Sequence, residues 1–183
     1  METTTATATK WQIDTAHSEI TFKVKHLMIS NVKGSFNKFD AEIDSSGNDF
    51  DNAQINLNID VASVDTSDAH RDGHLKGADF FDVENHPQIN FTSSKFEKKG
   101  NDMFELTGEL TMLGVTKPVK LDVEFGGIMK DPWGNNKAGF TVNGKINRKD
   151  WGLSYNAALE AGGVLVSDEV KIAGEIQLVK VAA

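Results

Sequence analysis

The residues Ile20-Thr21-Phe22-Lys23-Val24-Lys25-His26 set the pattern from which the fold follows. Apolar and polar side chains alternate along this stretch, so that Phe22 and Val24 share one face with His26. Successive side chains of a β-strand point to opposite faces of the sheet. The stretch therefore predicts a strand with one buried face and one solvated face.

The same alternation recurs along most of the chain and predicts eight strands. Their inward residues lie within 20–26, 32–43, 55–61, 89–93, 104–112, 119–125, 138–146 and 170–178. A change of phase near Asn37-Lys38 indicates a bulge in the second strand. Long one-sided antiparallel strands favour a closed barrel, because closure leaves no free edge. We expect an all-β fold, an eight-stranded antiparallel up-and-down barrel.

One segment, 68–82, departs from this alternation and predicts a short helix. Thr66 or Ser67 can cap its start, Asp68 favours the first turn, and Gly77 can cap its end. Such a segment on a barrel is either a lid or an active site.

The segment places His70 and His74 four residues apart, a spacing found in zinc-binding helices. Those helices also carry a Glu beside the first His. Here Arg71 stands beside His70 and opposes a cation, while Gly73 weakens the helix. We expect no metal site, and we interpret the segment as a lid that Arg71 and Asp72 hold in place.

The composition bounds the class of protein. The chain has 183 residues, no Cys and a net charge of −8. We expect a disordered tail over 1–10 and a single domain over 11–183. The acidic balance disfavours nucleic acid and anionic membranes as partners. No apolar stretch is long enough to span a bilayer, so we expect no stable membrane insertion. Without a secretory signal the expected location is cytoplasmic, or periplasmic if a leader has been removed.

Sequence patterns for catalysis and cofactors are weak. His17-Ser18-Glu19 brings a Ser beside a His, but adjacency in sequence does not make a catalytic triad. No Gly-rich phosphate loop leads from a strand into a helix, so no nucleotide cofactor is expected.

The inward apolar stripes predict either a packed core or a tunnel. An eight-stranded barrel has room for its own side chains or for one slim ligand. Small inward residues, among them Gly34, Gly108 and Gly144, leave interior space or permit sharp coiling. A long hydrocarbon could complete such a core, with about 0.8 kcal/mol gained per buried methylene.

Four segments resemble the YceI-like, or polyisoprenoid-binding, family. They are Ile13–Ser18 leading to Phe22–His26, Arg71–Leu75 running to Asp79–Asp82, Leu106–Thr111 with Gly114–Val119, and Asn147–Leu153. The resemblance extends from about residue 11 to 181. It implies a lipocalin-like barrel, often dimeric, whose elongated tunnel holds isoprenoid-type or other long aliphatic lipids. It implies no established catalytic activity.

We therefore expect a homodimeric, non-enzymatic protein that binds a long-chain isoprenoid or other amphiphilic lipid, for transport, storage or sequestration. The expected tunnel residues are Phe22, Val24, Phe36, Ile55, Leu57, Phe80, Phe81, Phe91, Leu106, Leu110, Leu121, Phe140, Val142, Ile172 and Ile176. The expected contacts to a polar headgroup are His26, Arg71, His74 and Arg148.

Two alternatives stay open. One is an enzyme that acts on an isoprenoid or quinone-like lipid, with His74, His26 or Asp79 as acid–base groups. The other is a partner-binding module that uses an exposed apolar patch, such as a dimer face.

Overall fold

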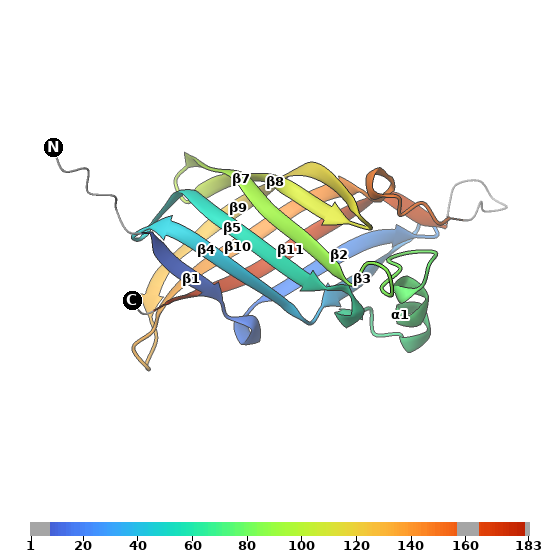
Figure 1. The fold of residues 1–183 in the computed structure, drawn as a ribbon, viewed down its shortest axis with the longest axis horizontal. Helices are drawn as coiled ribbons and strands as arrows, with labels where there is room; N and C mark the ends of the chain where they lie inside the picture. Colours follow the sequence, from blue (N-terminus) through green and yellow to red (C-terminus); the bar gives the residue numbers. More distant parts are fainter. Residues whose placement is uncertain (1–7, 157–164, 182–183) are drawn as a thin grey trace.

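The computed structural model describes residues 8–156 and 165–181, and its strands form one antiparallel sheet (Figure 1). The strands are β1 (Thr9–Ile13), β2 (Glu19–His26), β3 (Ser30–Phe36), β4 (Phe39–Ser46), β5 (Asp49–Asp60), β6 (Val64–Asp65), β7 (Gln88–Gly100), β8 (Met103–Met112), β9 (Val115–Lys130), β10 (Asn136–Asn147) and β11 (Val166–Lys180). The helical elements are α1 (Ala69–Lys76) and the 3-10 turns η1 (Thr15–His17), η2 (Val61–Ser63) and η3 (Arg148–Trp151).

The sheet closes on itself. Its strand order runs β1-β4-β5-β7-β8-β9-β10-β11, and β11 pairs with β1 again. This ring confirms the predicted eight-stranded antiparallel barrel. Three further strands, β2, β3 and β6, extend from the ring beside β11.

One edge of β11 is shared between β1 and β2. Ile13 lies opposite Leu178, whereas Ile20 lies opposite Gly174, so both strands follow the same edge in succession. The turn η1 separates them. β1 and β2 are therefore two halves of one bent strand, and only β1 continues the ring by pairing with β4.

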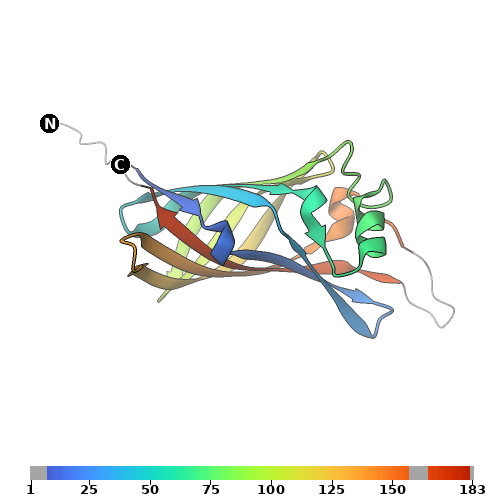
Figure 2. The same ribbon diagram turned by 90° about the horizontal axis from the view of Figure 1, so that it is seen from below.

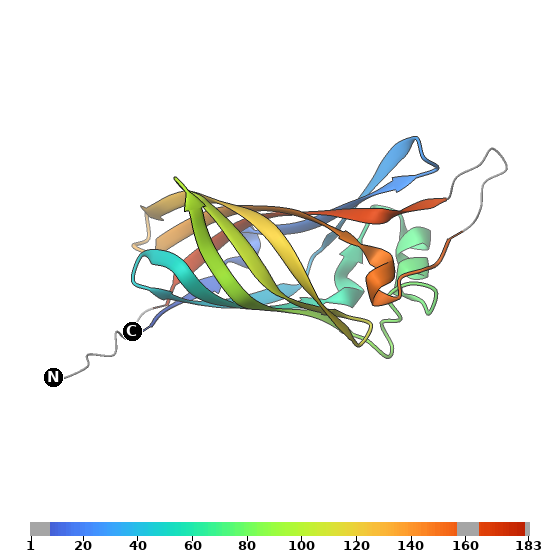
Figure 3. The same ribbon diagram turned by 90° about the horizontal axis from the view of Figure 1, so that it is seen from above.

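The next pair, β3 and β4, is broken in the same way at Asn37 and Lys38. Here the alternation predicted a bulge, and the structure has a full break between strands. The gap admits η2 and β6, because the Asn37 amide donates to the Ser63 carbonyl and Phe36 pairs with Val64. The β2–β3 hairpin consequently leaves the barrel wall at the end where α1 lies (Figures 2 and 3).

The sheet begins earlier than the sequence predicts. Thr9 and Lys10, which belong to the predicted tail, lie in β1 opposite Ser45 and Asp44. The alternation of Trp11 with Ile13 is too short to mark a strand by itself. Residues 1–7 of that tail lie outside the described residues.

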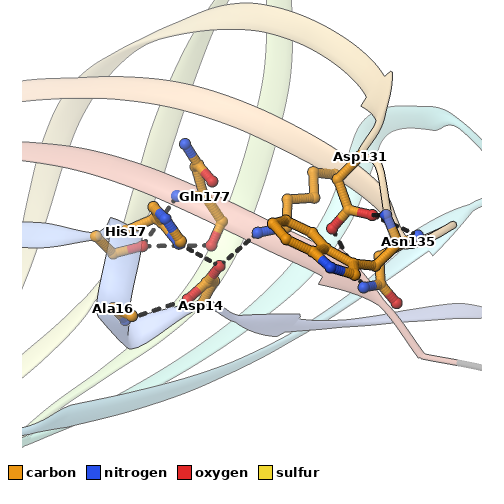
Figure 4. A network of polar contacts seen from close by, with 9 residues as sticks. Asp14, Ala16, His17, Asp131, Asn135 and Gln177 are labelled. Atoms are coloured by element: carbon orange, nitrogen blue, oxygen red, sulfur yellow. Dashed lines mark hydrogen bonds and ion pairs between the residues drawn. The ribbon is translucent and has the colours of Figure 1, made fainter.

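Asp14 anchors the turn between β1 and β2 (Figure 4). Its Oδ1 accepts a hydrogen bond from the Ala16 amide at 3.1 Å, and its Oδ2 lies 2.7 Å from Lys137 Nζ and 2.9 Å from His17 Nδ1. The Asp14 amide donates to the Gln177 carbonyl on β11. The Lys137 hydrogen bond, with help from His17, lowers the pKa of Asp14 to about 2 although burial opposes the shift.

The residues His17 and Ser18 thus have structural partners. His17 contacts Asp14, and Ser18 Oγ accepts a hydrogen bond from the Gln177 amide at 2.9 Å. These contacts fasten η1 to β11 where the strand bends.

Replacing Asp14 with Asn should lower the free energy of unfolding by about 1–3 kcal/mol at neutral pH, because a hydrogen-bonded charge is lost and Lys137 keeps its positive charge. The native pKa lies below the unfolded value of 3.8. The carboxylate therefore stabilises the fold fully above about pH 4, and this contribution is lost as the pH falls towards about 2. Urea unfolding of both proteins between these pH values measures it.

The matched control is Asp44→Asn, which removes the exposed ion pair with Lys10. It should change stability by less than about 1 kcal/mol. The role given to Asp14 would be contradicted if D14N lowered the free energy of unfolding as much near pH 2 as at neutral pH. It would also be contradicted if D14N lowered it no more than D44N does.

Candidate functional site

The barrel encloses a cavity of about 520 Å³. Along β11 it is bordered by residues from Val166 to Leu178. Twelve residue steps span about 40 Å at roughly 3.3 Å each, and the tilt of barrel strands reduces this to about 30 Å along the axis. The cavity is therefore long and narrow, and the strands that surround it turn their apolar faces inward.

All of the predicted tunnel residues border this cavity. They are Phe22, Val24, Phe36, Ile55, Leu57, Phe80, Phe81, Phe91, Leu106, Leu110, Leu121, Phe140, Val142, Ile172 and Ile176. Alternation identified those that lie on strands, because every second residue of a strand lies on the same face. Phe80 and Phe81 instead belong to the turns that follow α1. The interior space expected beside the inward-facing glycines is partly filled by neighbouring side chains. A Cβ on Gly34 would lie 2.3 Å from Phe22, and one on Gly108 would lie 2.4 Å from Phe91.

Aromatic rings fill the barrel at the end where β1 begins. Phe50 is at the centre of this aromatic plug, with its ring centroid 5.1 Å from Trp11, 5.6 Å from Phe125 and 5.0 Å from Phe140. Phe96 and Phe104 complete the plug and stack at 4.6 Å. Phe50 and Trp11 are almost fully buried. Buried aromatic side chains therefore occupy this end of the barrel.

Sequence reasoning missed Phe50 because the phase of β5 changes beside it. Asn52 has a φ of +64°, which adds a residue between the inward-facing Phe50 and Ala53. Counting by twos from Ile55 therefore places Phe50 on the outer face. Asn52 is the only hint of this phase change in the Asp49-Phe50-Asp51-Asn52 stretch, since Asn tolerates a left-handed backbone conformation better than most residues.

The opposite end is covered by α1 and the turns that follow it. Phe81 packs edge-on against Phe36 at 5.9 Å, and Phe80 lies 5.0 Å from Tyr155. The His74 ring lies 5.1 Å from Tyr155. Since Phe80 and Phe81 both border the cavity, this segment forms its inner wall at the mouth.

Thr66 holds this lid in position. Its hydroxyl accepts a hydrogen bond from Arg71 Nε at 2.8 Å and donates to Asp72 Oδ1 at 2.5 Å. Its carbonyl accepts from the Arg71 guanidinium at 2.7 Å, and its amide donates to Asp72 at 2.9 Å. Arg71 and Asp72 thus fix the lid as expected, through a residue that the sequence did not single out for this contact.

The caps of α1 differ in part from those expected. The N-cap is Asp68, whose carboxylate accepts a hydrogen bond from the Arg71 amide, so the expected caps Thr66 and Ser67 were wrong. Thr66 is engaged instead with Asp72. The C-cap is Gly77, as the sequence predicts.

The four candidate headgroup residues all border the lid end of the cavity. His26 ends β2, Arg71 and His74 belong to α1, and Arg148 begins η3. His74 Nε2 contacts Asp79 at 3.1 Å, so Asp79 pairs with His74 and not with Arg71. His70 does not border the cavity.

Arg148 differs from the other three because backbone carbonyls engage its guanidinium. It is buried and donates to the carbonyls of Ser167, Leu153 and Val166. Burial lowers its pKa, and Asp168 opposes that shift. Arg148 therefore joins η3 to β11. Arg71 keeps a free donor, since within the described ranges its Nη1 makes no hydrogen bond.

Two chemical observations complete the site. Across 8–156 and 165–181, no three His, Cys, Asp or Glu side chains come together as metal ligands would. None of the helices in the same ranges is long and apolar enough to cross a membrane.

The fold and cavity define a class, the small antiparallel barrels that enclose an apolar chamber, to which lipocalins belong. The chain belongs to the YceI-like domain family, whose model matches residues 11–178. This membership confirms the family predicted from the four motifs.

Relatives and solved structures agree with that membership. A UPF0312 protein of Staphylococcus epidermidis is 40% identical over 164 residues, which covers 89% of this chain and 93% of that protein. The Campylobacter jejuni YceI protein has a TM-score of 0.76 at 37% identity, covering 87% of this chain and 91% of that one. A polyisoprenoid binding domain from Saccharophagus degradans has a TM-score of 0.66, covering 93% and 98%; at 15% identity it shows the fold alone.

Replacing Thr66 with Val should loosen the lid while leaving the barrel intact. The variant keeps the shape of the side chain but removes the hydroxyl between Arg71 and Asp72. The free energy for local opening of residues 69–76 should fall by about 1–3 kcal/mol, because a charged group loses a partner. Hydrogen exchange read by mass spectrometry measures this.

The control is Thr111→Val, which removes a hydroxyl pair with Thr116 on the sheet. It should leave exchange in the lid unchanged. Equal protection of 69–76 in the T66V variant and the original protein would show that Thr66 does not hold the lid.

Proposed function

We propose that the protein binds one long-chain isoprenoid or similar amphiphilic lipid along the cavity and keeps it from water during transport or storage. The observation that carries this proposal is the asymmetry of the cavity. Its walls are apolar, one end is filled by the aromatic plug, and Arg71, His26 and His74 border the other end. An amphiphile with one long apolar tail and one polar end matches that arrangement.

The energetics favour a long, flexible tail. Each methylene removed from water contributes about 0.8 kcal/mol. Summed over a long tail, these contributions exceed the limit of non-covalent binding free energy near −20 kcal/mol. The entropy lost when the tail is ordered must therefore offset much of the gain from burial. The volume of the cavity also falls in the usual range for small-molecule sites, about 300–1,000 Å³.

The polar end of the lipid is proposed to lie at the lid. Thr66 orients the Arg71 guanidinium beside the cavity and leaves Nη1 as a donor. A guanidinium binds phosphate or carboxylate oxygens well because its donors are planar and permanently charged. His26 and His74 supply further donors, while Arg148 contributes mainly to the wall.

The comparisons support a lipid in general terms. The Saccharophagus degradans neighbour is described as a polyisoprenoid binding domain, and the family has the same barrel. A quinone-like cargo, the homodimer and the cytoplasmic location stay predictions. No comparable observation favours the enzyme or the partner-binding module over the carrier.

Mass spectrometry of organic extracts from the natively purified protein should detect a long-chain lipid. Val142→Phe adds about four carbons inside the cavity, where the lipid tail would lie. At about 0.8 kcal/mol per methylene displaced, lipid content should fall at least tenfold. The neighbouring Thr141→Phe is the control, because Thr141 Oγ1 contacts Glu175 on the outer face. It should retain the lipid.

Circular dichroism establishes that each variant is folded, and Val24→Phe near the mouth replaces V142F if that variant does not fold. A native protein without lipid that polyprenols also fail to stabilise against heat would contradict the proposal. So would equal lipid content in V142F and T141F.

A further inference from the structure

Four lysines form a continuous row across the outer face of four neighbouring strands. Lys33 of β3 lies opposite Lys23 of β2, Lys23 lies opposite Lys171 of β11, and Lys171 lies opposite Lys145 of β10. Residues directly opposite each other in an antiparallel pair have Cβ atoms about 5 Å apart, and like charges at such positions are destabilising. This lysine row is therefore unfavourable for the fold itself.

Little in the protein neutralises the lysine row. Across the parts of the chain that the structure describes, Lys23, Lys33 and Lys171 make no ion pair, and Lys145 reaches Glu169 only at 4.0 Å. All four lysines border one surface hollow of about 440 Å³, together with the carboxylate of Asp122, which forms no ion pair with any of them in the described ranges. The chain has 27 acidic residues against 19 basic ones, so the concentration of unpaired positive charge here departs from the overall balance.

An exposed apolar tip lies on the same hairpin. Leu27, Met28 and Ile29 join β2 to β3 and are 40%, 50% and 84% exposed. Leu27 and Met28 also have positive φ values of 54° and 64°, which bulky side chains rarely adopt. Packing against residues 8–156 and 165–181 does not explain three consecutive large apolar side chains in strained backbone at a hairpin end.

The apolar tip lies beside the mouth of the cavity. The Leu27 amide donates to the Leu165 carbonyl at 2.9 Å, and Leu165 borders the cavity together with His26. Figure 3 shows the β2–β3 hairpin extending past the barrel at the end that carries α1. A surface that engaged the apolar tip would therefore lie next to the lid.

We propose that the lysine row and the apolar tip together dock the mouth of the barrel on an anionic lipid bilayer. Apolar side chains enter the boundary between headgroups and acyl chains, while lysines attract anionic headgroups. Net charge alone predicted the opposite, because it ignores where the charges lie. A second copy of the chain fits this face poorly, since a symmetric contact would bring two lysine rows together.

This docking goes beyond the proposed function and can be tested without a bound lipid. The full-length protein is mixed with vesicles of phosphatidylcholine containing about 30 mol % phosphatidylglycerol, or of phosphatidylcholine alone, and binding is measured by flotation. Binding should require the anionic lipid. It should weaken between about 0.1 M and about 0.5 M salt, because the Debye length shortens.

The double variant Lys23→Gln, Lys171→Gln should bind anionic vesicles about 30-fold more weakly, since each lysine near such a surface contributes about 1 kcal/mol. Its melting temperature should be unchanged or higher, because like charges have been removed. The control, Lys98→Gln with Lys130→Gln, changes the charge equally on β7 and β9 and should bind as the original protein does. Ile29→Ser should also weaken binding.

Several results would overturn the proposal. They are absence of binding to anionic vesicles, equal loss in the two double variants, and binding to heparin but not to vesicles, which would indicate a polysaccharide. If the protein is a dimer that does not bind vesicles, and I29S converts it to a monomer, the apolar tip serves self-association instead. A protein that binds vesicles yet holds no lipid would contradict only the carrier function.

Discussion

The division of one edge of β11 between β1 and β2 is the constraint on which the rest of the structure depends. A strand offers one row of hydrogen-bonding groups on each side, so β1 and β2 must follow each other along it. Only β1 can then close the ring with β4. The hairpin that β2 begins has to leave the barrel, and Asp14 fixes the point of departure through Lys137 and the Gln177 carbonyl.

This departure makes the two ends of the barrel different. Where β1 and β4 complete the ring, Phe50 and its aromatic neighbours pack inside the barrel. Where the hairpin leaves, the ring is incomplete, and η2, β6 and α1 cover the gap. Thr66, which directly follows β6, holds α1 in this cover by binding both Arg71 and Asp72. A chamber with one filled end and one covered end results, and its polar groups gather at the covered end.

Charge is also distributed unevenly between the strands around the β2–β3 hairpin and the rest of the barrel. The strands around the departing hairpin carry lysines directly opposite one another, whereas Asp14 and Glu97 elsewhere pair with lysines. A protein of net charge −8 has enough carboxylates to neutralise such a row. Repulsion between like charges that the fold does not neutralise is typical of functional surfaces, where a binding partner supplies the opposite charge.

The sequence by itself determined the elements of this protein. Alternation such as that of Phe22 and Val24 gave the strands and their inward residues, because side-chain direction is a local property of the backbone. Gly77 marked the end of α1, and four motifs in order identified the family. Tertiary structure alone decided the bend at Asp14, the aromatic plug around Phe50, the Thr66 contacts and the lysine row. The bend, the plug and the lysine row depend on the register between strands distant in sequence, which no local pattern encodes. The Thr66 contacts span only five and six residues, but they form because the chain turns back between β6 and α1.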